Sequence, residues 1–96
     1  MDRMRIDKWL WHARFYRTRP LAQRACMAGF IRLNGQRVEK PAVILRCGDI
    51  VTLPRGRDVA AIRVLGLGER RGSAPEARQL YEVMVETVLD PSAAAP

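Results

Sequence analysis

Cationic side chains near the start of the sequence carry its clearest chemical signal. Six arginines or lysines fall within residues 5–24, and Asp7 is the single carboxylate among them. A guanidinium forms paired hydrogen bonds to phosphate and stacks on nucleobases. Side chains three and four positions apart are neighbours on a helix, so these cations would share one surface if the segment is helical. The pattern predicts an anion-binding surface, and nucleic acid is the commonest such anion.

The net charge is unevenly distributed along the chain. The 96 residues include 17 Lys plus Arg and 10 Asp plus Glu, for a formal charge of +7. Residues 1–57 hold 13 basic and 4 acidic side chains, whereas residues 58–96 hold 4 basic and 6 acidic ones. This asymmetry favours nucleic-acid binding by the N-terminal half of the chain.

The sequence offers little for catalysis or metal binding. His12 is the only histidine, and it is expected on a helix surface or against RNA rather than as a general base. Cys26 and Cys47 stand apart with no CxxC spacing, so both are expected to be buried, reduced thiols. The glycines form no nucleotide-binding loop. We therefore predict a protein that is not an enzyme, has no catalytic residue and holds no metal or cofactor.

Two helices are predicted to position the cations. Apolar residues recur at helical spacing through residues 5–16, and Trp9 is expected to lie in the core. Thr18 is predicted to cap a second helix that runs to about Ala28, where Gly29 ends it. The corner between the two helices would gather the cations on one side.

Aromatic residues near this corner have two interpretations. Trp11 or Tyr16 could stack on an unpaired base, as aromatic rings do in single-strand recognition. Phe15 and Phe30 are instead expected in the hydrophobic core.

After Gly29 the apolar period changes to the alternation that is typical of strands. Asn34-Gly35 is the strongest short hairpin signal, and Gly48-Asp49 marks a second turn. The predicted strands are residues 30–33, 36–38, 43–45, 50–53 and 60–67, with a basic loop at 54–58.

The C-terminal part is predicted to be helical. Residues 68–72 are interpreted as a charged, glycine-rich connector. A capping box at Ser73 and Glu76, followed by apolar residues every four positions, predicts a third helix over residues 73–89. The tail, residues 90–96, is predicted to be disordered.

The predicted fold class is α+β: a two-helix corner, then a small, mostly antiparallel sheet, then a C-terminal helix that packs on a domain spanning residues 1–67. The longest apolar run without a charge, residues 25–31, is far shorter than the roughly 20 residues of a membrane span. A cytoplasmic monomer that does not contact membranes is expected.

Five short motifs, in order, resemble the S-four RNA-binding domain, which is named for a primary rRNA-binding protein of the small ribosomal subunit. The motifs are Arg5-Ile-Asp-Lys-Trp-Leu10, Thr18-Arg19-Pro-Leu-Ala22, Gly29-Phe-Ile-Arg-Leu-Asn34-Gly35, Lys40-Pro41 and Gly48-Asp49. They cover residues 5–53. The resemblance implies helices followed by an L-shaped hairpin, the α-L motif.

The run Trp9-Leu-Trp-His-Ala-Arg14 and the stretch around Tyr81 resemble, more narrowly, the heat-shock protein fifteen family of bacterial ribosome-associated proteins. This resemblance implies a heat-shock, stress-response protein that binds free large ribosomal subunits carrying stalled peptidyl-tRNA and aids their recycling. It also implies more general binding of RNA and DNA.

The charge pattern and the resemblance together predict one RNA-binding set. Its members are Arg5, Lys8, Arg14, Arg17, Thr18, Arg19, Gln23, Arg24, Arg32, Asn34 and Lys40. The expected ligands are ribosomal RNA and the large subunit. A general DNA- and RNA-binding protein is the main alternative, and a small nuclease or a membrane-surface protein is a weaker one.

Overall fold

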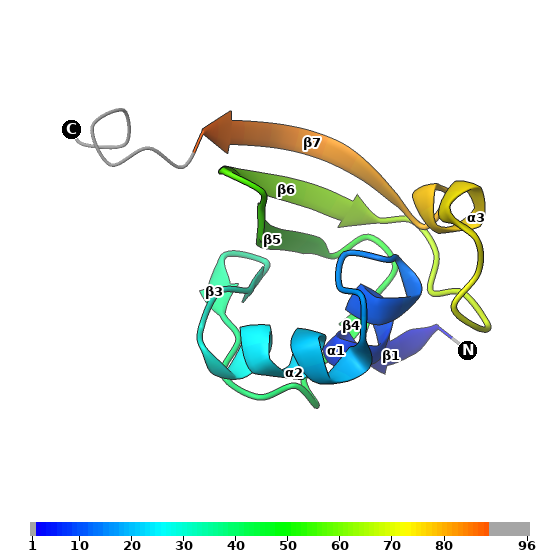
Figure 1. The fold of residues 1–96 in the computed structure, drawn as a ribbon, viewed down its shortest axis with the longest axis horizontal. Helices are drawn as coiled ribbons and strands as arrows, with labels where there is room; N and C mark the ends of the chain where they lie inside the picture. Colours follow the sequence, from blue (N-terminus) through cyan, green and yellow to red (C-terminus); the bar gives the residue numbers. More distant parts are fainter. Residues whose placement is uncertain (1, 89–96) are drawn as a thin grey trace.

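A pair of short helices lies beneath an antiparallel sheet, and a third, shorter helix lies at one end of that sheet (Figure 1). The structure is a computed structural model that describes residues 2–88. Its elements are β1 (Arg3–Arg5), α1 (Ile6–His12), α2 (Arg19–Met27), β2 (Arg32–Leu33), β3 (Gln36–Arg37), β4 (Ile44–Arg46), β5 (Ile50–Arg55), β6 (Asp58–Val64), α3 (Ala74–Arg78) and β7 (Tyr81–Val88).

The first helix ends four residues earlier than the sequence predicts. Arg14 adopts a left-handed φ of 63°, and the Phe15 amide donates to the Leu10 carbonyl at 3.0 Å. This is a Schellman-type helix end, with arginine at the position where glycine is usual. The second helix begins as predicted, because the Thr18 hydroxyl accepts from the Leu21 amide at 3.3 Å.

The strands form two sheets. Five antiparallel strands follow the order β3-β2-β5-β6-β7, and β1 pairs separately with β4. Asn34 and Gly35 have φ values of 51° and 85°, so they form the predicted two-residue hairpin turn. Strand β1 was not predicted, since a three-residue strand offers almost no periodicity to detect.

The predicted C-terminal helix is wrong beyond Arg78. Ser73 caps α3 as expected, accepting from the Glu76 amide at 3.4 Å, but the helix ends at Arg78. Residues 81–88 instead form β7 along β6. The reason is physical: Val83 and Val85 are β-branched and pack well on a pleated surface, and pairing to β6 overrides the four-residue spacing of the apolar side chains. The tail predicted to be disordered lies outside the described residues.

The core lies between the helix pair and the sheet. Trp9 is fully buried, as expected, and its indole Nε1 donates to the Gly66 carbonyl at 2.7 Å. Two expectations about the core are wrong: Phe30 is 61% exposed, and Cys47 is exposed although Cys26 is buried. Within residues 2–88, no helix has the length and apolarity that crossing a membrane requires.

Candidate nucleic-acid interface

A buried carboxylate organises the centre of the predicted RNA-binding set. Asp7 is fully buried, and its two oxygens accept hydrogen bonds from both helices and from β1. Arg5 donates at 3.1 and 3.2 Å, Arg19 at 3.3 Å and Gln23 at 3.0 Å, while the Lys8 amide donates at 2.8 Å. Three side chains of the predicted RNA-binding set therefore donate to the same carboxylate.

These contacts keep the Asp7 carboxyl group ionised by lowering its pKa. Burial by itself would raise the pKa of this carboxyl, but hydrogen bonds from Gln23, Arg5 and Arg19, with the charge of Arg19, outweigh it and lower the pKa below its ordinary value. The anion is thus held inside, while the Arg5 and Arg19 side chains remain 43% and 34% exposed. The guanidinium groups are fixed in orientation and still accessible to a phosphate.

An open groove of about 850 Å³ lies beside this network. It is lined by Arg3, Met4, Arg5, Lys8, Arg19, Ile44, Leu67, Gly68 and Glu69, and is called the basic groove below. Four cations oppose the single carboxylate of Glu69, and three apolar side chains contribute to its wall. The groove can accept phosphates on its rim and ribose or base against its apolar part.

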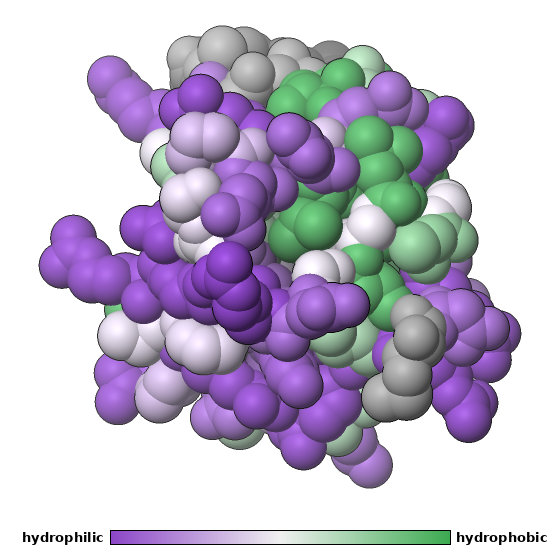
Figure 2. All heavy atoms as spheres, turned by 90° about the vertical axis from the view of Figure 1, so that its right-hand side faces the viewer, coloured by the Kyte–Doolittle hydropathy of each residue, from purple (hydrophilic) through white to green (hydrophobic). Residues whose placement is uncertain are grey.

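Arg3 is the cation of the basic groove that sequence reasoning missed. It precedes the predicted helix, whereas the structure places it on β1, paired with Arg46 of β4. The alternation of charged and apolar side chains in Arg3-Met4-Arg5 was the one available signal. The end of the molecule that carries α3 and the N-terminus is mostly hydrophilic, with its apolar residues gathered in one band (Figure 2).

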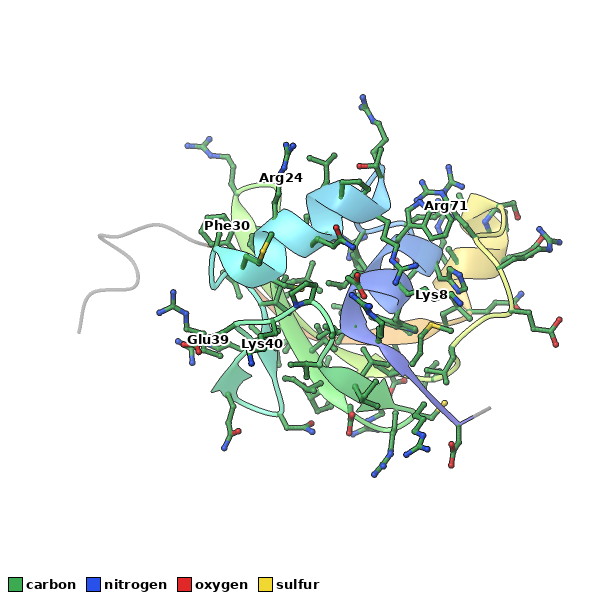
Figure 3. The ribbon with its side chains drawn as sticks, turned by 90° about the horizontal axis from the view of Figure 1, so that it is seen from below. Lys8, Arg24, Phe30, Glu39, Lys40 and Arg71 are labelled. Carbon is green, nitrogen blue, oxygen red and sulfur yellow. The ribbon has the colours of Figure 1, made fainter. Side chains whose placement is uncertain are left out.

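The remaining predicted site residues lie elsewhere. Arg24 lies near Phe30 and apart from Lys8, while Lys40 lies beside Glu39 (Figure 3). Arg17, Arg24, Arg32 and Lys40 are all exposed, so each is available to an anion, but not in the basic groove. The eleven predicted residues therefore do not form one continuous patch around Asp7.

Three of the predicted residues hold the chain itself. Thr18 caps α2, and Asn34 bridges two strands by accepting from the Ile50 amide at 2.9 Å and donating to Asp49 at 3.2 Å. Arg14 donates to the Gly72 carbonyl at 2.9 Å. These contacts give all three a structural role whatever else they bind.

Arg71, which the sequence did not single out, lies beside Trp11, one of the two rings that could stack on an unpaired base. Its Nη1 donates to the carbonyls of Trp11 and Tyr16, both at 3.0 Å, and its guanidinium lies 5.6 Å from the centre of the Trp11 ring. Burial and the charge of Arg14 lower the Arg71 pKa. The Trp11 ring is therefore already in contact with a cation from the same chain.

His12 is buried rather than on the surface, which corrects the expectation from sequence. It is 2% exposed, and its Nδ1 lies 3.2 Å from the Leu67 carbonyl. Burial is the main cause that lowers its pKa, which favours the neutral form of the ring. Among the described residues, no group of three or more His, Cys, Asp or Glu side chains could hold a metal ion.

Comparison with known proteins agrees with this fold. Residues 4–51 match the S4 domain, the S-four domain of the sequence analysis, and the chain belongs to this family. It is also similar to solved and curated proteins named heat shock protein 15. The Vibrio cholerae protein, whose structure is described as trimeric, superposes with a TM-score of 0.81 at 42% identity, covering 86% of this chain and 83% of that one.

Two curated relatives illustrate this similarity. The heat shock protein 15 homolog of Aeromonas salmonicida is 46% identical over 79 residues, which are 82% of this chain and 59% of that protein. The chain thus spans about three fifths of this relative's length. The RQC P-site tRNA stabilizing factor of Halalkalibacterium halodurans is 32% identical over 89 residues, 93% of this chain and 99% of that protein.

Proposed function

We propose that this chain binds structured ribosomal RNA through the basic groove. One observation carries the proposal: buried Asp7 fixes Arg5 and Arg19 at the edge of a groove that Arg3 and Lys8 also line. Fixing an arginine before binding reduces the entropy lost when it meets a phosphate. Phosphate contacts position a protein on a nucleic acid, so the shape of the RNA sets the site more than base sequence does.

The proposed ligand in the cell is the free large ribosomal subunit carrying stalled peptidyl-tRNA. The similarity to heat shock protein 15 supports ribosome association, and the name of the H. halodurans relative, a P-site tRNA stabilizing factor, supports contact with tRNA. The protein would act in the cytoplasm, without catalysis, by holding or releasing this complex. The monomer expected from the sequence stays a prediction, and the similar Vibrio cholerae structure is described as trimeric.

The first prediction concerns the basic groove itself. The Lys8→Ala plus Arg19→Ala variant should bind structured RNA more weakly, and the slope of log K against log salt should fall by roughly 0.7–0.9 for each phosphate that the variant no longer neutralises. Filter binding at several salt concentrations measures both quantities. In sucrose gradients of cell extract, the native chain should migrate with free large subunits and the variant should not.

The matched control is Arg63→Ala plus Arg78→Ala, which removes the same charge from β6 and α3. Arg63 makes only an exposed ion pair with Glu82, so this control should fold and bind normally. If both variants lose affinity equally, net charge rather than the basic groove binds RNA. Equal affinity for duplex DNA and structured RNA would favour the alternative, a general nucleic-acid-binding protein.

A further inference from the structure

A second groove opens on a different part of the surface from the basic groove. It has a volume of about 570 Å³ and is called the Phe30 groove below. It is lined by Tyr16, Leu21, Arg24, Ala25, Ala28, Phe30 and Pro54. The two grooves share no lining residue. Arg24 and Phe30 lie together in Figure 3, away from Lys8.

The backbone holds the Phe30 ring outside the core. Gly29 ends α2 with a φ of 79°, and the Phe30 amide donates to the Ala25 carbonyl at 3.1 Å. Ile31, the next residue, is fully buried, so alternation along the chain directs Phe30 outward. Phe30 is 61% exposed and Leu21 41% exposed. Apolar surface gathered in a groove is typical of a binding site.

The charges around the Phe30 groove select the class of ligand. Arg24 is part of its wall, while exposed Arg17 and Arg55 directly follow the lining residues Tyr16 and Pro54 in the chain. No lining residue is acidic. Aromatic rings with flanking cations are the arrangement by which proteins bind single-stranded nucleic acid, because bases stack on the rings and phosphates meet the cations.

We propose that the Phe30 groove binds an unpaired nucleobase of the RNA, stacked on Phe30, with a neighbouring phosphate on Arg24. The inference rests on the proposed RNA-binding function but assigns a contact outside the basic groove. It gives the protein a means to prefer RNA with an unpaired nucleotide over a continuous duplex. A charge-free apolar ligand would leave Arg24, the cation of the groove wall, without a role.

The test uses two RNA hairpins that differ only by one bulged 2-aminopurine, whose fluorescence is quenched on stacking. The native chain should bind the bulged hairpin more tightly and quench or shift its fluorescence. Phe30→Leu keeps an apolar side chain but removes the ring, so it should lose about tenfold in affinity for the bulged hairpin and lose the fluorescence change. Phe30→Trp should retain both.

Two controls separate this inference from the proposed function. Met27→Leu alters an exposed apolar residue of α2 that lies outside the groove lining, and it should change neither affinity nor fluorescence. Lys8→Ala plus Arg19→Ala should weaken binding of both hairpins, whereas Phe30→Leu should affect only the bulged one. Failure of the native chain to bind either hairpin overturns the proposed function and the inference with it.

Three outcomes overturn the inference alone. The first is equal binding of the two hairpins by the native chain. The second is an unchanged fluorescence signal in Phe30→Leu. The third is binding of an uncharged, leucine-rich peptide by the native chain but not by Phe30→Leu, without displacement by the bulged hairpin, which would assign the groove to a protein partner.

Discussion

Asp7 shows how one buried side chain can prepare a surface for an anion. A negative charge placed in full burial is costly unless it is paired and hydrogen-bonded, and here two arginines, one amide side chain and one backbone amide satisfy it. The carboxylate in turn holds Arg5 and Arg19 close together in spite of their mutual repulsion. The exposed cations can then meet a phosphate without first being ordered.

The variant Asp7→Asn should lower the free energy of unfolding by about 2 kcal/mol at pH 7, because it removes the charge that strengthens the hydrogen bonds from two partly exposed arginines, Arg5 and Arg19. The pKa of Asp7 in the fold lies below its ordinary value of 3.8, so its stabilising effect is full above that value and is lost as pH falls through the folded pKa. Urea denaturation of both proteins at pH 7, 5 and 3 measures this. A difference as large at pH 3 as at pH 7 would contradict the ionic explanation.

At this site the sequence predicted three of the side chains that meet, but not the carboxylate that brings them together. Helical spacing and charge identified Arg5, Arg19 and Gln23, but Asp7 was noted only as the single carboxylate among the cations. Its burial depends on α2 packing over α1, a contact between residues that are 12 and 16 positions apart. The sequence also placed Phe30 in the core. Its outward direction follows from the backbone conformation at Gly29, which only the structure shows.

At the scale of elements, β7 replaces most of a predicted helix. Val83 and Val85 are 44% and 57% exposed, so each side chain packs only in part against its neighbours on the sheet. Pairing with β6 favours the strand over the helix, because β7 forms seven residue pairs with β6 and completes the sheet. The earlier elements were predictable because each has a local signal: the Thr18 cap, the Asn34-Gly35 turn and the Ser73 cap. The pairing of β7 with β6 has no comparable local signal in the sequence.

Val85→Ala distinguishes the strand from the predicted helix by the sign of its effect. Alanine is the better residue in a helix, by several tenths of a kcal/mol, whereas valine is the better one in a strand, by up to about 1 kcal/mol. The urea midpoint of Val85→Ala should therefore fall. Gln79→Ala, in the turn before β7, serves as the reference for an exposed substitution. A urea midpoint that rises in Val85→Ala would instead support the helix predicted from the sequence.

At the scale of the whole molecule, the segment after β6 joins the sheet to the helix pair. Trp9 donates to Gly66, His12 lies against Leu67, and Arg71 donates to two carbonyls at the ends of α1 and the corner. The same segment supplies Leu67, Gly68 and Glu69 to the basic groove. A stretch that the sequence marks as a simple connector thus positions one wall of the proposed RNA site.

Arg71→Ala should therefore affect both stability and RNA binding. It leaves the Trp11 and Tyr16 carbonyls without their charged donor, which should cost about 2 kcal/mol in unfolding free energy. Arg71→Lys should recover only part of this, because an ammonium lacks the planar fork of a guanidinium. Urea denaturation gives the stability, and filter binding of a structured RNA should show weaker binding as the wall of the basic groove loosens.

Arg70→Ala is the matched control, since it removes an adjacent arginine whose ion pair with Glu76 is long, at 3.7 Å, and largely exposed. That pair should contribute almost nothing to stability. Both variants lower the net charge by one, so a purely electrostatic effect on RNA affinity would be equal in the two. Greater weakening in Arg71→Ala, measured below its unfolding transition, would show that the segment after β6 acts through the geometry of the groove. Equal weakening of RNA binding in the two variants would show that Arg71 contributes only its charge.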